Sequence, residues 1–84
     1  MKVVFIDQGW EDYLFWQKQD KKVLKKIHDL LRDIYRNPYK GLGSPEPLKH
    51  DLSGYWSRRI TLEHRLVYRM LDGQIRVVQC RYHY

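Results

Sequence analysis

The 84-residue sequence contains one cysteine, three prolines and no long apolar stretch. Because Cys80 has no second cysteine to pair with, an internal disulfide is excluded, which is typical of proteins in a reducing compartment. No apolar run is longer than residues 3–6, and such a run is too short for a membrane span or for the core of a signal peptide. We therefore expect a cytoplasmic protein with neither a cleaved leader nor a membrane anchor.

The sequence also lacks the signatures of several enzyme classes. It has no P-loop, no Gly-rich dinucleotide turn and no Ser-centred elbow. His28, His50 and His64 do not have the spacing of metal ligands, and one cysteine with scattered histidines makes a poor zinc site. We expect neither a metal nor another cofactor.

The composition, 43% hydrophobic and 31% charged, is that of a globular domain. A chain of this length forms one small domain, over residues 1–84, with modest stability. Its net charge of +6 attracts polyphosphate through counterion release, and attracts acidic protein segments as well. Charge alone therefore does not choose between a nucleic acid and a protein partner.

Two helices are predicted in the first half of the chain. The first covers residues 8–19 after an N-cap at Asp7, with Trp10, Tyr13 and Leu14 on its apolar face.

The second helix has the clearest pattern in the sequence. It begins after an N-cap at Asp20, and its polar face is rich in lysine and arginine. Its apolar residues follow the i, i+3, i+4, i+7 spacing of an amphipathic helix: Val23, Leu24, Ile27, Leu30, Leu31 and Ile34.

Four strands are predicted around these helices. Residues 2–6 form the first, and residues 55–60, 65–71 and 75–82 follow a loop, residues 37–47, that holds all three prolines. The order β-α-α-β-β-β predicts an α+β domain in which both N-terminal helices pack on one face of a mostly antiparallel four-stranded sheet.

The turn between the last two strands decides which side chains share a face. A two-residue turn at Asp72-Gly73 would place Leu66 opposite Gln79 and mix apolar with polar residues on both faces. A three-residue loop, residues 72–74, places Leu66 opposite Cys80 instead. Because a one-residue slip exchanges the faces, we expect burial to select the three-residue loop.

That register gathers Arg65, Arg81 and His83 on the face away from the helices and turns Cys80 and Tyr82 toward the core. Guanidinium groups bind phosphate in a bidentate manner, and histidine can carry protons near neutral pH. Arg81 is therefore a candidate substrate-binding residue. On these residues alone, a plain solvated strand face remains the favoured interpretation.

Glu46 is a second candidate, because it lies between Pro45 and Pro47. The fixed φ of one proline and the extended conformation imposed by the other stiffen the backbone that carries this carboxylate. Lys49 follows three residues later. An exposed glutamate in a proline-rich turn is the commoner explanation of such a string.

Three segments together are specific: PEPLKHDLSGYWSRRI at 45–60, EHRLVY at 63–68 and CRYHY at 80–84. With them, the chain closely resembles, from end to end, the YoeB family of toxins within the RelE/ParE superfamily of toxin–antitoxin proteins. The segment EDYLFW and the short first strand fit the resemblance too. It implies a RelE-like fold.

The resemblance further implies an endoribonuclease that cleaves mRNA in the ribosomal A site without a metal, by attack of the 2′-hydroxyl on the adjacent phosphate. Glu46 matches the general base of the family, His83 its general acid, and Arg65 the arginine that stabilises the phosphorane. Three more residues match substrate-positioning residues: Lys49, Arg59 and the C-terminal Tyr84.

The partners implied by the resemblance are a YefM-like antitoxin with an acidic C-terminal segment, the ribosome with its mRNA, operator DNA through the antitoxin complex, and a second copy of the chain. Two alternatives stay open. One is a ParE-like toxin that acts on DNA gyrase, which has no need for the set Glu46, Arg65 and His83. The other is a basic module that binds nucleic acid without catalysis.

Overall fold

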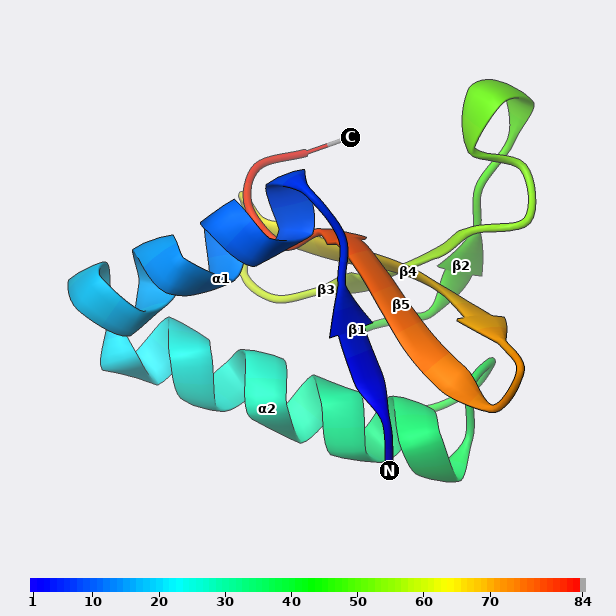
Figure 1. Cartoon of the computed structure of the whole chain (residues 1–84), viewed down its shortest axis with the longest axis horizontal. Helices are drawn as coiled ribbons and strands as arrows, with labels where there is room; N and C mark the ends of the chain where they lie inside the picture. The colour runs from blue at the N-terminus through cyan, green and yellow to red at the C-terminus, as the bar shows by residue number, and fades with distance from the viewer. Residues whose placement is uncertain (84) are drawn as a thin grey trace.

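A five-stranded sheet forms one layer of the structure, and two helices form the other (Figure 1). The computed structural model describes residues 1–83. The strand order is β1-β5-β4-β3-β2, in which β1 runs parallel to β5 and the other neighbours are antiparallel. The elements are β1 (Val3–Phe5), α1 (Gln8–Gln19), α2 (Lys21–Arg36), β2 (Glu46–Pro47), the 3-10 helix η1 (His50–Leu52), β3 (Trp56–Arg59), β4 (Arg65–Leu71) and β5 (Gln74–Gln79).

The predicted α+β class is confirmed, and the sheet has one strand more than predicted. The additional strand is β2, in which Glu46 pairs with Ser57 and Pro47 with Trp56. A proline fits this position because β2 is an edge strand, and the residue before a proline favours extended backbone. The part of the predicted loop that carries Glu46 is therefore tied to the sheet.

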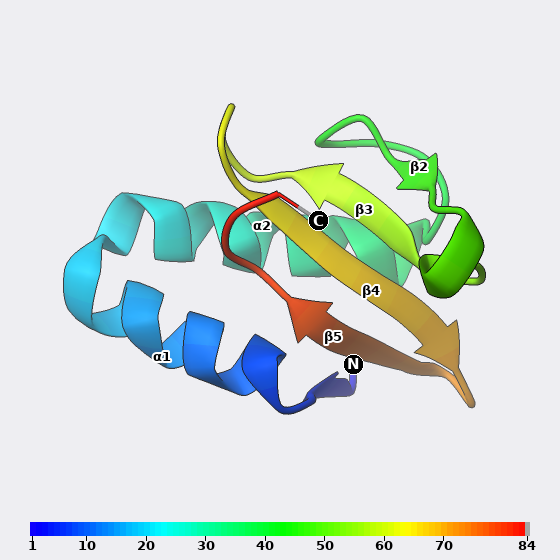
Figure 2. The same ribbon diagram turned by 90° about the horizontal axis from the view of Figure 1, so that it is seen from above.

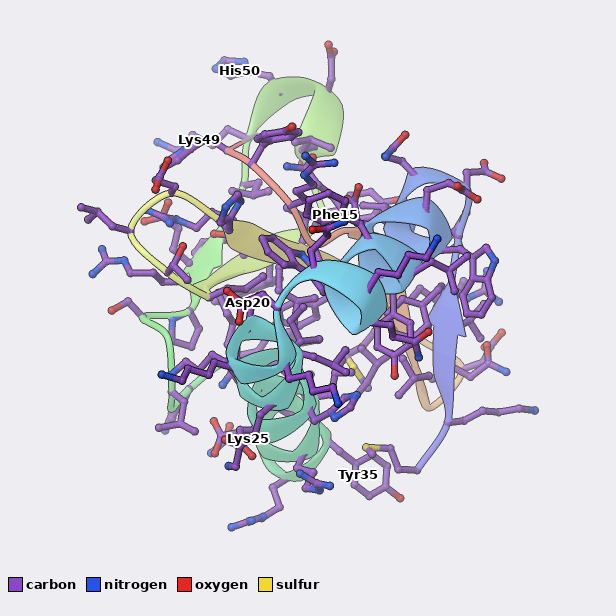
Figure 3. The ribbon with its side chains drawn as sticks, turned by 90° about the vertical axis from the view of Figure 1, so that its left-hand side faces the viewer. Phe15, Asp20, Lys25, Tyr35, Lys49 and His50 are labelled. Atoms are coloured by element: carbon purple, nitrogen blue, oxygen red, sulfur yellow. The ribbon has the colours of Figure 1, made fainter. Side chains whose placement is uncertain are left out.

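Both helices begin and end near their predicted limits. The Asp20 carboxylate accepts hydrogen bonds from the backbone N–H groups of Lys22 and Val23, which confirms it as the cap of α2. Figure 3 shows Asp20 at this helix start and Lys25 on the outer side of α2. Asp7 precedes α1 but makes no side-chain cap bond. No helix within residues 1–83 is long and apolar enough to cross a membrane.

The face that α1 buries differs in part from the predicted one, since Tyr13 packs against the core as predicted. The buried residues are Gly9, Asp12 and Trp16, whereas Trp10 and Leu14 are 47% and 37% exposed. Gly9 explains the orientation, because a Cβ at this position would lie 2.4 Å from the backbone oxygen of Val77. Only glycine permits this close approach of α1 to β5.

The core lies between α2 and the inner face of the sheet. The predicted apolar stripe of α2 enters it, and Trp16 closes it from α1. Its fully buried members, each with no exposed surface, come from α2 and from three segments of the sheet region: Ile27, Leu30, Ile34, Leu66, Tyr68, Ile75, Val77 and Cys80.

The β4–β5 hairpin combines both of the registers weighed above. Its turn has two residues, since Leu71 pairs with Gln74, and the predicted three-residue loop is therefore wrong. Asp72 and Gly73 both have positive φ, at 52° and 72°, as a two-residue hairpin turn requires.

A β-bulge then shifts the pairing by one residue. Tyr68 pairs with Val77, whereas Val67 pairs with Gln79, so Val78 is the additional residue in β5. Beyond the bulge, the pairing equals that of a three-residue loop. Without a change in the turn, the bulge thereby places Cys80, and not Gln79, beside Leu66 on the face that packs against the helices.

Arg58 in β3 is fully buried, and its guanidinium connects three parts of the fold. It forms an ion pair with Asp33 of α2 and donates to the Tyr68 hydroxyl of β4. It also donates to three backbone carbonyls of the loop after α2, those of Asn37, Lys40 and Leu42.

Asp33 completes this network from α2. Its carboxylate accepts the backbone N–H of Leu42 at 2.9 Å as well as the guanidinium of Arg58. The hydrogen bond from Leu42, and after it the one from Arg58, hold the pKa of Asp33 below its usual value. The network therefore contains an ionised carboxylate at neutral pH.

We predict that Arg58→Met lowers the free energy of unfolding by about 3 kcal/mol or more, because it removes the cation paired with Asp33 and the donor to three loop carbonyls. The measurement is urea denaturation at neutral pH. Arg32→Met is the matched control, because Arg32 forms an exposed ion pair with Asp29 and should contribute little. Equal unfolding midpoints for the two variants would contradict the role of Arg58.

Candidate active site

A small cavity of about 110 Å³ lies on the sheet face opposite the helices. Leu66 and Tyr68 of β4 point to the helical core, so Arg65 and Val67 point to the other face. The lining residues are Gly43, Ser44, Glu46, Ser57, Arg59, Arg65 and His83.

Strand register brings the charged residues of the cavity together. Glu46 pairs with Ser57, and Arg59 pairs with Arg65 in the neighbouring strands. Paired residues share a face with Cβ atoms about 5 Å apart, and the next residue on that face lies about 7 Å along the strand. Glu46 and the two arginines therefore occupy adjacent rows of one surface.

Arg65 is fixed by the turn that precedes it. Its Nη1 donates to the backbone oxygens of Thr61, Leu62 and His64 at 2.8, 3.1 and 3.1 Å. Its own backbone N–H donates to the oxygen of Tyr82 at 3.0 Å, which ties the C-terminal segment to the start of β4. The guanidinium therefore has a defined position beside the cavity.

His83 reaches the cavity because the chain turns away from β5. The predicted strand to residue 82 is wrong: β5 ends at Gln79, and Tyr82 has a φ of +63°. Figure 2 shows the C-terminal segment curling back over β4. His83 and Arg65 both line the cavity, although His83 reaches it from a turn and not from the predicted strand face.

Arg81 does not line this cavity. Its guanidinium carbon is 3.5 Å from the centre of the Phe15 ring of α1, in a cation–π contact. It lines another hollow, together with Asp12, Gln79 and His83, so His83 borders both hollows. Because the strand has ended, alternation no longer determines the direction of the Arg81 side chain.

Two more predictions concern the same terminal segment. Cys80 is buried as predicted, and burial, with a smaller contribution from Asp12, raises the pKa of its thiol to about 12. Tyr82 is 58% exposed, so its predicted position in the core is wrong. Tyr84 lies outside the described residues.

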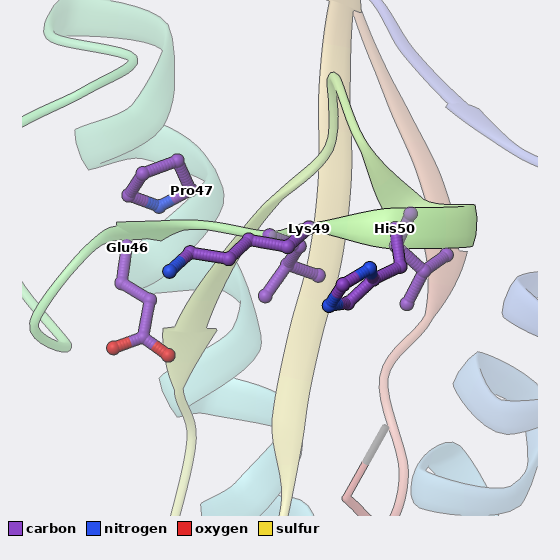
Figure 4. A pocket seen from close by; sticks show the side chains of 6 residues that line it. Glu46, Pro47, Lys49 and His50 are labelled. Atoms are coloured by element: carbon purple, nitrogen blue, oxygen red, sulfur yellow. The ribbon is translucent and has the colours of Figure 1, made fainter.

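Lys49 lies beside the cavity and lines a larger, open hollow that shares Glu46 with it. Figure 4 shows the Lys49 side chain extending along β2 toward the side of Glu46, with His50 beyond it. Lys49 thus lies near the Glu46 carboxylate, and Arg59 and Arg65 share a cavity with that carboxylate and with the His83 imidazole. This set suits an anionic ligand, such as a phosphate, beside a proton acceptor and a proton carrier.

No group of three His, Cys, Asp or Glu side chains that could hold a metal occurs within residues 1–83.

The cavity contains residues that sequence reasoning did not select. Ser57 precedes Arg59 by two positions in a strand, so alternation could have placed both on one face. Gly43 and Ser44 have positive φ, at 77° and 51°, in a loop whose path no sequence pattern predicts.

Known proteins share both the sequence and the fold of this chain. The family model described as "YoeB-like toxin of bacterial type II toxin-antitoxin system" matches residues 5–84. The chain belongs to the YoeB family of toxins. Toxin YoeB of Escherichia coli K12 is 55% identical over 84 residues, covering 100% of both chains.

Solved structures of YoeB toxins share the fold over the whole chain. The YoeB/ParE toxin from Agrobacterium tumefaciens is 55% identical with a TM-score of 0.94, covering 100% of both chains. Staphylococcus aureus YoeB, solved as a YoeB-YefM complex and as a YoeB dimer, is 48% and 49% identical in the two structures, and each has a TM-score of 0.93. Each alignment covers 100% of this chain and 98% of the S. aureus chain.

Gly43 sets the position of the loop that forms one wall of the cavity. Its carbonyl accepts the backbone N–H of Arg59 at 2.7 Å. A Cβ at Gly43 would lie 2.9 Å from the Arg59 oxygen and 3.0 Å from a methyl carbon of Leu30. The loop is therefore pressed directly against β3.

We predict that Gly43→Ala lowers the free energy of unfolding more than Gly54→Ala does. Both glycines have positive φ, which costs an alanine about 1–2 kcal/mol, but a Cβ at Gly54 has no neighbour within 4 Å. Urea denaturation of the two variants measures the difference. Equal destabilisation would show that the contact with β3 is not tight.

Proposed function

We propose that this YoeB-family toxin is a ribosome-dependent endoribonuclease that cleaves mRNA in the A site and thereby inhibits translation. The observation that carries the proposal is the presence of Glu46, Arg65 and His83 in one cavity, although they come from three separate chain segments. This is the set that the family resemblance requires. The net charge of +6 supports binding to RNA through counterion release.

The proposed reaction is an internal transfer at phosphorus. Glu46 accepts the proton of the ribose 2′-hydroxyl, and that oxygen forms a bond with the adjacent phosphorus. The bond from phosphorus to the 5′-oxygen breaks, and His83 donates a proton to the leaving 5′-oxygen. The products are a 2′,3′-cyclic phosphate and a 5′-hydroxyl, with no metal and no other reactant needed.

The cations stabilise the charge that develops during this transfer. Arg65 is held by three carbonyls, so its donors are oriented before the substrate binds, and we assign it to the phosphorane oxygens. Arg59 and Lys49 add positive charge on either side of Glu46, and we assign them to positioning the phosphate. Tyr84 is assigned to the same site from the resemblance. Arg81, stacked on Phe15, receives no role at the phosphate.

We predict that Glu46→Gln and His83→Gln each lower the cleavage rate by about 10²–10⁴-fold, because each removes one proton-transfer step. Primer extension on transcripts incubated with purified toxin, with and without ribosomes, measures cleavage. Controls are Glu11→Gln and His28→Gln, since Glu11 lies in the first turn of α1 and His28 of α2 hydrogen-bonds to Tyr13.

Three outcomes would contradict the proposal. Undiminished cleavage by the Glu46→Gln, His83→Gln double variant would show that neither residue takes part in the reaction. A gradual, salt-dependent loss of binding without any cleavage would favour a basic nucleic-acid-binding module. Arrested replication with intact transcripts would favour a toxin that acts on gyrase.

We also propose that this toxin binds a YefM-like antitoxin. The S. aureus toxin was solved in a YoeB-YefM complex, and the charge of +6 favours an acidic antitoxin segment. We infer that the complex binds its operator DNA chiefly through the antitoxin. Because S. aureus YoeB was also solved as a dimer, we propose that this chain pairs with a second copy, which sedimentation equilibrium would detect.

We predict that an electrophoretic mobility shift of operator DNA requires the antitoxin. Antitoxin alone and the complex should shift the operator at physiological salt, whereas toxin alone should bind it no better than unrelated DNA. Such non-specific binding depends on phosphate charge and falls steeply with salt. An operator shift that is unchanged when the antitoxin is omitted would refute this assignment.

A further inference from the structure

The segment that carries His83 is held by side chains from α1 and from the turn before β4. The Cys80 backbone N–H donates to the Asp12 carboxylate at 3.0 Å, and the Cys80 oxygen accepts the Trp16 indole N–H at 2.8 Å. Both side chains are buried, with exposed fractions of 3% and 6%. The backbone of Cys80 is therefore hydrogen-bonded to side chains of α1. In a strand, the same backbone groups would bind a neighbouring strand.

His64 holds the other end of this segment. Its Nδ1 accepts the backbone N–H of Tyr82 at 2.7 Å, one residue before His83. Nδ1 must be unprotonated to accept this bond, so the neutral ring carries its proton on Nε2. The ring packs edge-on against Trp16, with centroids 4.8 Å apart and planes at 77°.

This bond holds the backbone in a conformation that it would otherwise avoid. Tyr82 has a φ of +63°, which costs a residue other than glycine about 1–2 kcal/mol. The segment lies beyond the end of β5, so strand pairing does not define its path. The His64 ring and the Arg65 N–H, which bind the N–H and the oxygen of Tyr82, offset this cost.

We propose that His64 is a positioning residue for His83, with Asp12 and Trp16 as the other anchors of the same segment. His64 does not line the cavity and does not touch the reacting phosphate; it acts through the backbone of Tyr82. A misplacement of a catalytic group by about 1 Å can lower a rate by about 10²-fold, so this bond affects turnover. The inference rests on the proposed role of His83 as general acid.

Two variants of His64 separate positioning from packing. His64→Phe keeps a ring against Trp16 but removes the acceptor for the Tyr82 N–H. His64→Asn removes the ring but places its Oδ1 where Nδ1 stood, two bonds from Cβ. We expect His64→Phe to lower kcat by about 10- to 100-fold with KM unchanged, and His64→Asn to keep kcat within about threefold of the wild type.

Two further measurements accompany the kinetics, which are made on ribosomes programmed with mRNA. Thermal unfolding shows whether each variant folds, and amide hydrogen exchange of Tyr82 reports its bond directly. Exchange of this amide should be faster in His64→Phe than in His64→Asn. If His64→Phe does not fold, the variant Trp16→Phe is used in its place. Trp16→Phe removes the donor to the Cys80 oxygen and keeps an aromatic ring.

A double-variant cycle identifies the group through which His64 acts. In the His83→Gln background, His64→Phe should cause no further loss of residual cleavage, since the group that it positions is already absent. An additional loss of the same size as in the wild type would overturn the inference. Wild-type kcat in His64→Phe, or equal losses in His64→Phe and His64→Asn, would overturn it as well.

The two proposals fail in different ways. If the wild type does not cleave RNA on programmed ribosomes, the proposed function fails, and the role of His64 in catalysis fails with it. If the wild type cleaves and Tyr82 exchange is equal in both His64 variants, only the positioning role fails.

Discussion

The buried guanidinium of Arg58 is the interaction on which much of this structure depends. A fully buried charge is costly unless it is paired and hydrogen-bonded, and Arg58 meets this condition with partners from α2, β4 and the loop after α2. These bonds fix the loop just before Gly43. Arg59, the next residue, points to the opposite face and lines the cavity. One dipeptide in a strand thus supplies both the internal support of the site and part of its surface.

The candidate active site joins three chain segments that are held in different ways. Glu46 is held by edge-strand pairing, Arg65 by the carbonyls of a turn, and His83 by a segment that is anchored to α1 and to His64. The close approach of Gly9 to β5 brings Asp12 and Trp16 of α1 within reach of Cys80. Helix packing and site geometry are therefore linked through the end of the chain.

The β-bulge explains how the hairpin combines two pairing registers that a regular ladder cannot contain together. The Asp72-Gly73 turn favours a two-residue connection, whereas burial of Cys80 beside Leu66 requires the register of a longer loop. One additional residue in β5 resolves the conflict, at the cost of a local disruption of pairing. The sequence-based prediction assigned a single register to the whole hairpin, because it did not include a bulge.

The sequence by itself determined α2 with its cap at Asp20, the position of the β4–β5 hairpin, the fold class and the family. These features depend on residues that lie close together in the chain or on motifs that the family shares. Tertiary structure alone decided which face α1 buries, where β5 ends and where Arg81 points. The reason is the distance along the chain: the bonds from Cys80 to Trp16 and Asp12 join residues 64 and 68 positions apart, and no local pattern encodes them.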